Sequence, residues 1–283
     1  MPLEAHQESR KGERIGVVKY RSARAQRLKR WQKTTPLNAY WLDRKFLWGA
    51  VEAFAPKASG VLLDVGGSET PYRSMFEPYV THYVGMEYPP AILDKQPEMW
   101  DLLYSVNHLV NLLGDGRRLP ILTDSVDTVL CTEVLEHVHD PHVLMAEMAR
   151  VLKPGGTLLV TVPFIQPLHE LPSDYYRFTP SSMYRFAEDA GLEVESVEPR
   201  GNFASAMGSM LSQWLIRSVG ARRRQSDGSV ILSRWRSVLL LPFTAMIQIG
   251  FLLASKVTND ETVCHGYSVV ATKGKPPAQK PSA

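Results

Sequence analysis

A short apolar run that ends in an acid and two glycines constrains this chain more than any other feature. Residues 61–67 read Val-Leu-Leu-Asp-Val-Gly-Gly, which predicts a buried strand leading into a tight turn. Glycines in such a turn let the backbone approach a ligand closely. A second apolar run, residues 82–86, is followed by Glu87, where a ribose-binding acid lies in nucleotide-type βαβ units. These residues predict a nucleotide-type site, and a tight turn without a ligand is the alternative.

Strand-like and helix-like segments alternate along the middle of the chain. Apolar residues at helical spacing predict a helix over residues 36–54, packed on the core and ended by Pro56. Two further helices begin with a proline after a capping residue, Asp140 before Pro141 and Thr179 before Pro180. The alternation predicts an α/β fold with a mostly parallel sheet and helices on both faces. The expected strands are 61–65, 82–86, 109–113, 126–131, 157–162 and 192–198; the two helices are 141–152, stopped by Lys-Pro-Gly-Gly at 153–156, and 180–190, stopped by Gly191.

The charge of the chain is uneven, although its net value is only +3. Residues 1–35 hold ten Lys or Arg against three acids, and they contain no apolar core of a signal peptide. Such a basic arm suits an anionic lipid or nucleic-acid surface, or is a solvated, partly disordered leader. Residues 273–283 are expected to be a disordered tail. Cys131 and Cys264 lie in apolar runs, which predicts buried thiols in a reducing compartment.

Four segments, at residues 61–67, 83–88, 112–120 and 124–164, together resemble the class I S-adenosylmethionine-dependent methyltransferases, specifically the branch called type 11. The last segment is the most specific, with Leu-Glu-His-Val after the fourth strand and Arg-Val-Leu-Lys-Pro-Gly-Gly before the fifth. The resemblance implies a Rossmann-like, seven-stranded sheet whose last strand runs antiparallel between strands five and six. It places a methyltransferase core at residues 59–200, completed by a final strand near 263–272, and implies S-adenosylmethionine as cofactor.

Family roles carry over to several positions near the predicted strand ends. Asp64, Gly66 and Gly67 match the turn against which the methionine part of the cofactor lies. Glu87 matches the acid that accepts hydrogen bonds from the ribose hydroxyls, a contact that can dominate affinity because the acceptor is charged. The remaining matches are Asp115 beside the adenine amino group, Gly116 for backbone access, Leu119 near the adenine ring, and Glu133, Glu136 and His137 bordering the transferred methyl group.

One departure from the family pattern concerns the glycine turn itself. The family usually has glycines at the positions held here by Ser68 and Thr70. This puts the tightness of the loop in doubt.

A long loop at residues 162–180, rich in proline and aromatic residues, is the second cluster of interest. Long ordered loops in compact domains are usually functional. His169 and Tyr175 are therefore catalytic candidates beside His137, and His169 is the natural base for an alcohol acceptor. Asp174, Tyr176 and Arg177 are candidates for substrate binding. The alternatives are that His169 bonds the backbone, that His137 has a structural role, and that Arg177 pairs with Asp174.

Residues 201–262 form an insertion that a minimal fold does not need. Two apolar stretches, 205–220 and 238–254, flank a basic link. The second would be about 26 Å long as a helix, against a bilayer core of about 30 Å. A single span is excluded because the strands on either side must pair in one sheet. A shallow membrane hairpin, a cap over the site and a dimer interface remain as alternatives.

These observations predict a cytoplasmic methyltransferase for a small, lipid-linked or sugar-linked acceptor, peripheral on the inner face of an anionic membrane. No metal is expected, and the oligomeric state is left open. A nucleic-acid methyltransferase is disfavoured, because Tyr88-Pro89-Pro90 follows strand two rather than strand four, and because Cys131 has no proline before it. A non-catalytic scaffold with the same fold is the remaining alternative, and the missing glycines support it.

Overall fold

A computed structural model describes residues 35–67, 70–88, 111–224 and 230–275 of the chain. The basic arm, apart from its last residue, lies outside the described residues, as do Ser68, Pro89, Pro90 and the last eight residues.

The centre of the molecule is a seven-stranded sheet in the order β3-β2-β1-β4-β5-β9-β6. Neighbouring strands from β3 to β5 pair in parallel, whereas β9 runs antiparallel to both β5 and β6. This order confirms the predicted fold class, including the antiparallel last strand. The strands are β1 (Val61–Val65), β2 (His82–Glu87), β3 (Leu112–Leu113), β4 (Val126–Thr132), β5 (Leu152–Pro163), β6 (Leu192–Arg200) and β9 (Gly266–Lys273).

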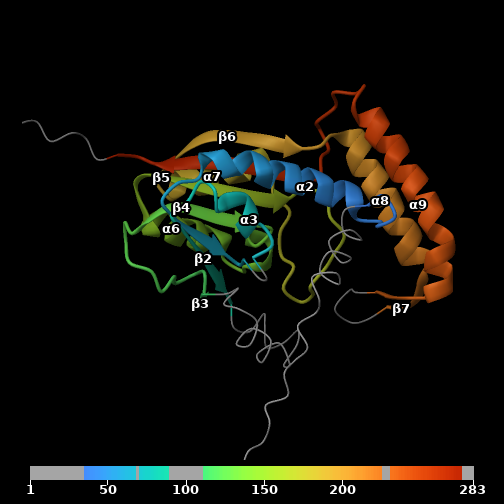
Figure 1. Cartoon of the computed structure of the whole chain (residues 1–283), viewed down its shortest axis with the longest axis horizontal. Helices are drawn as coiled ribbons and strands as arrows, with labels where there is room; N and C mark the ends of the chain where they lie inside the picture. Colours follow the sequence, from blue (N-terminus) through green and yellow to red (C-terminus); the bar gives the residue numbers. More distant parts are fainter. Residues whose placement is uncertain (1–34, 68–69, 89–110, 225–229, 276–283) are drawn as a thin grey trace, which may run out of the picture.

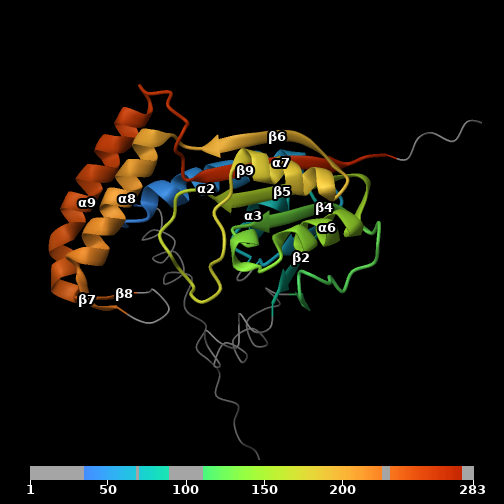
Figure 2. The same cartoon turned by 180° about the vertical axis from the view of Figure 1, so that it is seen from behind.

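Helices cover both faces of this sheet (Figures 1 and 2). Helices α2 (Trp41–Phe54) and α3 (Arg73–Phe76) cover one face, where Phe54 and Phe76 are buried against Leu62 of β1. Helices α6 (Pro141–Val151) and α7 (Pro180–Asp189) cover the other, where Met148 and Met183 join the larger core cluster. Short 3-10 turns, η1 (Ala55–Lys57) and η2 (Leu135–His137), follow α2 and β4. Cys131 and Cys264 are free and buried, as predicted.

The structure corrects several expected boundaries. Strand β5 begins at Leu152, so Lys-Pro-Gly-Gly lies within the strand instead of in a turn before it. Residues 153–156 are an irregularity in this pairing, because Val126 pairs with Leu152 and Thr128 next pairs with Thr157. The segment stays close to β4, since Lys153 Nζ lies 2.8 Å from the Asp127 carboxylate and Gly156 has no side chain to meet the Asp127 carbonyl. The third strand is shorter than expected, and α2 starts at Trp41. Asp140 precedes α6, but its side chain makes no cap hydrogen bond.

The insertion leaves the sheet after β6 and forms two long helices side by side at one end of the molecule (Figure 1). These are α8 (Phe203–Ser218) and α9 (Arg234–Ser255). The basic link between them forms a small antiparallel hairpin, β7 (Ala221–Arg224) and β8 (Val230–Leu232), which the sequence did not predict. Within the described residues, α9 is the one helix long and apolar enough to cross a membrane.

Candidate cofactor and acceptor site

The turn after β1 brings backbone and carboxylate into close contact. The Gly66 and Gly67 amides both donate to the Met86 carbonyl of the neighbouring strand, at 2.9 and 3.1 Å. A side chain at Gly66, where φ is 73°, would overlap Val134, and one at Gly67 would overlap the Asp64 carboxylate. Both positions therefore need glycine, and the turn exposes backbone at the carboxyl end of β1.

Asp64 is buried beneath this turn, and one of its two carboxylate oxygens has a hydrogen-bond partner. The Tyr83 hydroxyl donates to its Oδ2 atom at 2.5 Å, whereas its Oδ1 atom has no partner among the described residues. Burial raises the pKa of Asp64 to about 7, although the Tyr83 hydrogen bond opposes the shift. An unpaired, buried acceptor beside a glycine turn suits a cationic donor such as the amine of the cofactor.

Thr70 stands where the related family usually has glycine, and its backbone adopts a conformation that glycine favours. Its φ is 45°, in the left-handed region, and the residue is buried. The Thr70 amide donates to the Gly67 carbonyl at 2.6 Å, which closes the turn. The chain therefore keeps the local bend without the glycine, at a strain cost of about 1–2 kcal/mol.

Two further acids stand at the ends of neighbouring strands. Glu87 ends β2, and its Oε1 atom accepts from the Tyr88 amide at 2.8 Å. Asp115 follows β3 two residues after Leu113, which pairs with Glu87. The pairing of β2 with β3 thus puts both acids at one edge of the sheet, next to the turn that holds Asp64.

Asp115 has a partner that the sequence did not suggest. Arg117 donates to its carboxylate from Nε and Nη2, the latter at 2.8 Å, and from its backbone amide at 2.9 Å. These hydrogen bonds hold the pKa of Asp115 below its usual value. Arg117 lies two residues after Asp115, and this short spacing was the feature of the sequence that could have indicated the pair. Leu119 is buried in the core.

Glu133 follows β4 and anchors a buried polar network. Its φ is 51°, and its Oε1 atom accepts from Arg200 Nη2 at 2.9 Å. The same nitrogen of Arg200 donates to the Val162 carbonyl at 3.0 Å, so Arg200 joins the carboxyl ends of β4, β5 and β6. Strain at a residue on this edge is typical of functional sites.

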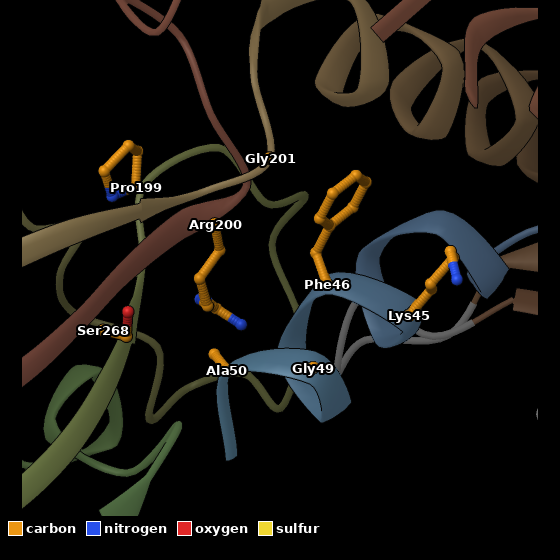
Figure 3. A pocket seen from close by; sticks show the side chains of 8 residues that line it. All are labelled: Lys45, Phe46, Gly49, Ala50, Pro199, Arg200, Gly201 and Ser268. Atoms are coloured by element: carbon orange, nitrogen blue, oxygen red, sulfur yellow. The ribbon is translucent and has the colours of Figure 1, made fainter. Parts of the chain in front are cut away.

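A cavity of about 350 Å³ opens between Arg200 and helix α2. Figure 3 shows Arg200 reaching from β6 toward that helix, which carries Lys45 and Phe46. The Nε and Nη1 atoms of Arg200 are buried and have no partner within the described part of the chain. Sequence analysis missed this arginine, since the end of a strand is an ordinary place for a charged residue.

Asp43 and His265 extend the network under α2. Burial raises the pKa of Asp43 to about 6, against the opposing charge of Arg200. Burial also lowers the pKa of His265 to about 3, and its Nδ1 atom lies 3.6 Å from Asp43 Oδ1. No clear signal in the sequence indicated Asp43, because α2 also carries Arg44, Lys45 and Glu52.

On the other side of β4, two histidines and an acid meet. His137 Nδ1 lies 2.6 Å from the Ser173 carbonyl, and His169 Nδ1 lies 3.1 Å from the Pro167 carbonyl. Each Nδ1 must donate to its carbonyl, which leaves each Nε2 with a lone pair. The two rings meet edge to face with centroids 4.8 Å apart. The backbone bond expected as an alternative for His169 is therefore present, and it leaves Nε2 as the basic atom.

Glu136 lies beneath these rings and is fully buried. Neither carboxylate oxygen has a partner among the described residues, and Oε1 lies 3.8 Å from His137 Nε2. Burial, together with the nearby charge of Glu133, raises the pKa of Glu136 well above its usual value. Burial also lowers the pKa of His137. Glu136, His137 and His169 offer ligand atoms within 4.8 Å of one another, a spacing that would admit a metal ion.

Two of the predicted substrate-facing residues, Asp174 and Arg177, have side chains that contact the loop itself. Arg177 donates to both Asp174 oxygens, at 2.7 and 2.9 Å, and to the carbonyls of Gln166 and Tyr176. Asp174 also accepts from the His169 amide at 3.0 Å. The alternative expected for Arg177, a pair with Asp174, is what the structure shows. The Tyr176 hydroxyl donates to the His139 carbonyl, while the Tyr175 ring is 46% exposed.

Comparisons with known proteins agree with this arrangement. Residues 63–160 match the family model described as a methyltransferase domain. Residues 63–160 form a class I S-adenosylmethionine-dependent methyltransferase domain. The match covers β1 to most of β5, and the strand order is the one that the family resemblance implied. S-adenosylmethionine is the methyl donor of this class.

Curated relatives match over part of their length. An uncharacterized methyltransferase of Mycobacteroides abscessus is 33% identical over 115 residues, which is 41% of this chain and 44% of the relative. A ubiquinone biosynthesis O-methyltransferase of Cupriavidus pinatubonensis is 38% identical over 94 residues, 27% of this chain and 37% of the relative. The chain thus spans less than half the length of these relatives. A solved putative methyltransferase of Haloferax volcanii, in complex with an activator, is 19% identical, with a TM-score of 0.49 over 83% of this chain and 90% of that one.

The residues of the domain fit the donor. Gly66 and Gly67 keep the turn backbone free of side chains that would overlap Val134 and the Asp64 carboxylate, and Asp64 Oδ1 is an acceptor without a partner among the described residues. Glu87 and Asp115 follow at the next two strand ends. These residues would hold the methionine part, the ribose and the adenine in that order along the edge.

Proposed function

We propose that the chain transfers a methyl group from S-adenosylmethionine to a small, lipid-linked or sugar-linked acceptor. The observation that carries this proposal is the convergence of Asp64, Glu87, Asp115 and Glu133 on the carboxyl ends of adjacent strands, where open α/β sheets bind ligands. When bound, the donor supplies a methyl carbon activated by its sulfonium. The acceptor class is supported by the loop at residues 164–179 and by the similarity to a ubiquinone biosynthesis O-methyltransferase.

In this proposal His169 takes the proton of an acceptor hydroxyl at its Nε2 atom. The Asp174 carboxylate lies 3.4 Å from Nδ1 and stabilises the imidazolium that forms. Burial raises the pKa of Asp174, but hydrogen bonds from Arg177 and the His169 amide lower it below its usual value, so it stays ionised. Asp174 and Arg177 are thus positioning residues for His169.

His137 and Glu136 flank the path between His169 and the cofactor edge. The raised pKa of Glu136 favours its neutral form, and in that form the carboxyl can donate a hydrogen bond to an acceptor oxygen. The exposed ring of Tyr175 is suited to stack on a ring-shaped acceptor.

The location that we propose is the cytoplasm, at an anionic membrane surface. The support is the largely unburied, apolar helix α9 together with the excess of Lys and Arg in residues 1–35. A nucleic-acid acceptor remains disfavoured on the sequence grounds given above.

Replacement of His169 tests the chemical role. In His169→Ala we expect methyl transfer to fall by about 10²–10⁴-fold, the range for loss of a general base, while donor affinity stays unchanged. Transfer of labelled methyl groups into lipid and sugar extracts is the readout, and titration calorimetry measures donor affinity. His142→Ala, an exposed histidine on α6, is the matched control. Full activity in His169→Ala would remove the base from this position.

Mass spectrometry of lipid and glycan extracts tests the acceptor class. Extracts from cells with the gene should contain a species heavier by one methylene unit than its counterpart in cells without it. Methylation confined to RNA or DNA would instead support the nucleic-acid alternative.

A further inference from the structure

The helical pair α8–α9 buries polar and small side chains and exposes large apolar ones, which is the reverse of the pattern expected in water. On α9 the two buried side chains are polar, Thr244 and Gln248, both 0% exposed. On α8 the buried side is made largely of small and polar residues, namely Ser205, Ala206, Gly208, Ser209, Ser212 and Gln213. Helices of water-soluble proteins bury an apolar stripe and expose polar residues. Small residues between helices, together with polar side chains that hydrogen-bond within the interface, are typical of helices in lipid.

Close approach of the helices depends on the small residues. A Cβ atom at Gly208 would overlap Phe251 of α9 and come within 3.1 Å of Leu42 on α2. Gln213 donates to Ser209 at 3.1 Å, which satisfies part of the buried polar face. Several large apolar side chains of the pair are left exposed, among them Trp214 of α8 and Trp235 of α9.

An unbroken apolar stripe runs along the outer face of α9. Its members recur every three or four residues from the first turn of the helix to just beyond its end, and Trp235 and Leu239 are 80% and 71% exposed. We call this the outer stripe; it consists of Trp235, Leu239, Phe243, Met246, Ile249, Leu253 and Val257. Contiguous exposed apolar surface of this length marks a binding surface.

The charged residues of α9 itself are all basic, whereas the acids Asp260 and Glu261 follow beyond the end of the outer stripe. Between Asp227 and Asp260 the sequence contains no acid, but it contains Arg234, Arg236 and Lys256. Arg236 and Lys256 are exposed near the two ends of α9. A cationic rim around an apolar stripe is complementary to a bilayer with anionic headgroups, and it would be repelled by a second copy of itself.

Contacts with α2 exclude a span across the bilayer. Gln248, in the middle part of α9, donates to the carbonyls of Pro36 and Asn38 at 2.8 Å and accepts from the Leu42 amide at 3.1 Å. If α9 crossed the membrane, the first turn of α2, with Asp43, Arg44 and Lys45, would enter the hydrocarbon core. The helix must therefore lie along the surface, with its inner face on α2 and its outer stripe free.

We propose that α9 lies in the plane of one leaflet, with the outer stripe in the boundary between headgroups and acyl chains and Arg236 and Lys256 at the phosphates. This names the surface and orientation of the membrane association proposed above, and it does not depend on methyl transfer. Helix α8 begins three residues after β6 ends, and the Phe164 amide donates to His265 at 2.9 Å. The pair α8–α9 (Figure 2) is thus attached to the same edge of the sheet as the candidate site. A lipid-linked acceptor in the membrane would therefore approach His169 from this edge.

Flotation with lipid vesicles tests this orientation without any methyl donor. We expect the full chain to float with vesicles of equal parts phosphatidylcholine and phosphatidylglycerol, and less with phosphatidylcholine alone. Phe243→Glu and Met246→Glu should each reduce binding by about tenfold or more, because each removes one large apolar side chain from the acyl boundary. Leu122→Glu is the matched control, because Leu122 is 80% exposed and is not part of α8 or α9. This variant should float like the native protein.

Two results of these flotation and sedimentation measurements would overturn the proposal. Equal flotation of Met246→Glu and the native chain would remove the outer stripe from the membrane. A native chain that stays in the soluble fraction and sediments as a dimer, which Phe243→Glu converts to a monomer, would assign the stripe to a second copy instead.

Tryptophan quenching measures depth independently. Bromine atoms on the upper acyl carbons should quench part of the emission of the native chain, and Trp235→Phe should lose most of that quenching. Quenching that is as strong from bromine at the bilayer centre would contradict the in-plane position. S-adenosylhomocysteine affinity, measured on the same variants, separates failure of this proposal from failure of the proposed function.

Discussion

Asp64 shows how one residue can link folding, pH and cofactor binding. Its pKa is raised from 3.8 to about 7 in the folded chain, so it holds a proton at pH values where an exposed acid would not. This raised value lowers stability as pH increases from about 4 to about 7, because the folded state there binds more protons than the unfolded state. A cationic amine beside Oδ1 would reverse this effect by favouring the carboxylate.

The affinity for S-adenosylhomocysteine should therefore depend on pH. We expect full affinity above pH 7 and a loss that approaches tenfold per pH unit below it, since the bound amine requires the ionised Asp64. Calorimetric titration between pH 5 and pH 8 measures this, within the range over which the fold is retained. Asp64→Asn should bind weakly at every pH, and a steep pH dependence that survives in this variant would assign the titration to another group.

At the scale of single elements, the loop after β5 and the helix α9 both derive their positions from buried polar contacts. Gln248 makes three hydrogen bonds to the start of α2, over a sequence separation of more than 200 residues. Loss of a buried partner costs about 1–3 kcal/mol for each group left unpaired. The docking of the insertion on the core should therefore depend strongly on this one amide.

Gln248→Leu is the change that isolates these hydrogen bonds, because it keeps most of the side-chain volume. We expect it to destabilise the chain by about 2–4 kcal/mol in urea denaturation, since the Leu42 amide and the carbonyls of Pro36 and Asn38 lose their partner. Gln166→Leu serves as the comparison, because the hydrogen bond from Arg177 to residue 166 is accepted by its backbone carbonyl. An unchanged free energy of unfolding in Gln248→Leu would show that α2 and α9 dock without this contact.

The parts that sequence could predict are those with local signals. The apolar runs at 61–65 and 126–131, the glycine turn and the proline-led helices all have short-range patterns, and the structure confirms the sheet that they imply. Lys-Pro-Gly-Gly was expected as a turn before the strand, but it lies within β5 as a break in the register with β4. Arg200, Asp43 and His265 were missed because they meet only through tertiary packing, from segments that are distant in the chain.

At the scale of the whole molecule, one edge of the sheet collects every candidate function. The glycine turn, the acids after β2 and β3, the histidine pair and the root of α8–α9 all lie at the carboxyl ends of parallel strands. Helix α2 joins the two parts, since it packs on β1 at one end and on Gln248 at the other. The fold therefore brings the proposed donor and acceptor residues and the base of the helical pair α8–α9 to one edge of the sheet.

Calorimetric titration of the native chain and Glu87→Ala with S-adenosylhomocysteine tests the central claim most directly. We predict saturable binding by the native chain and a loss of about 10–150-fold in Glu87→Ala, the equivalent of about 1.5–3 kcal/mol for hydrogen bonds to a charged group. Glu77→Ala, an exposed acid after α3, should bind like the native chain, and all three should share one circular dichroism spectrum. Native affinity in Glu87→Ala, or no heat from the native chain, would contradict the assignment of this edge as a methyl-donor site.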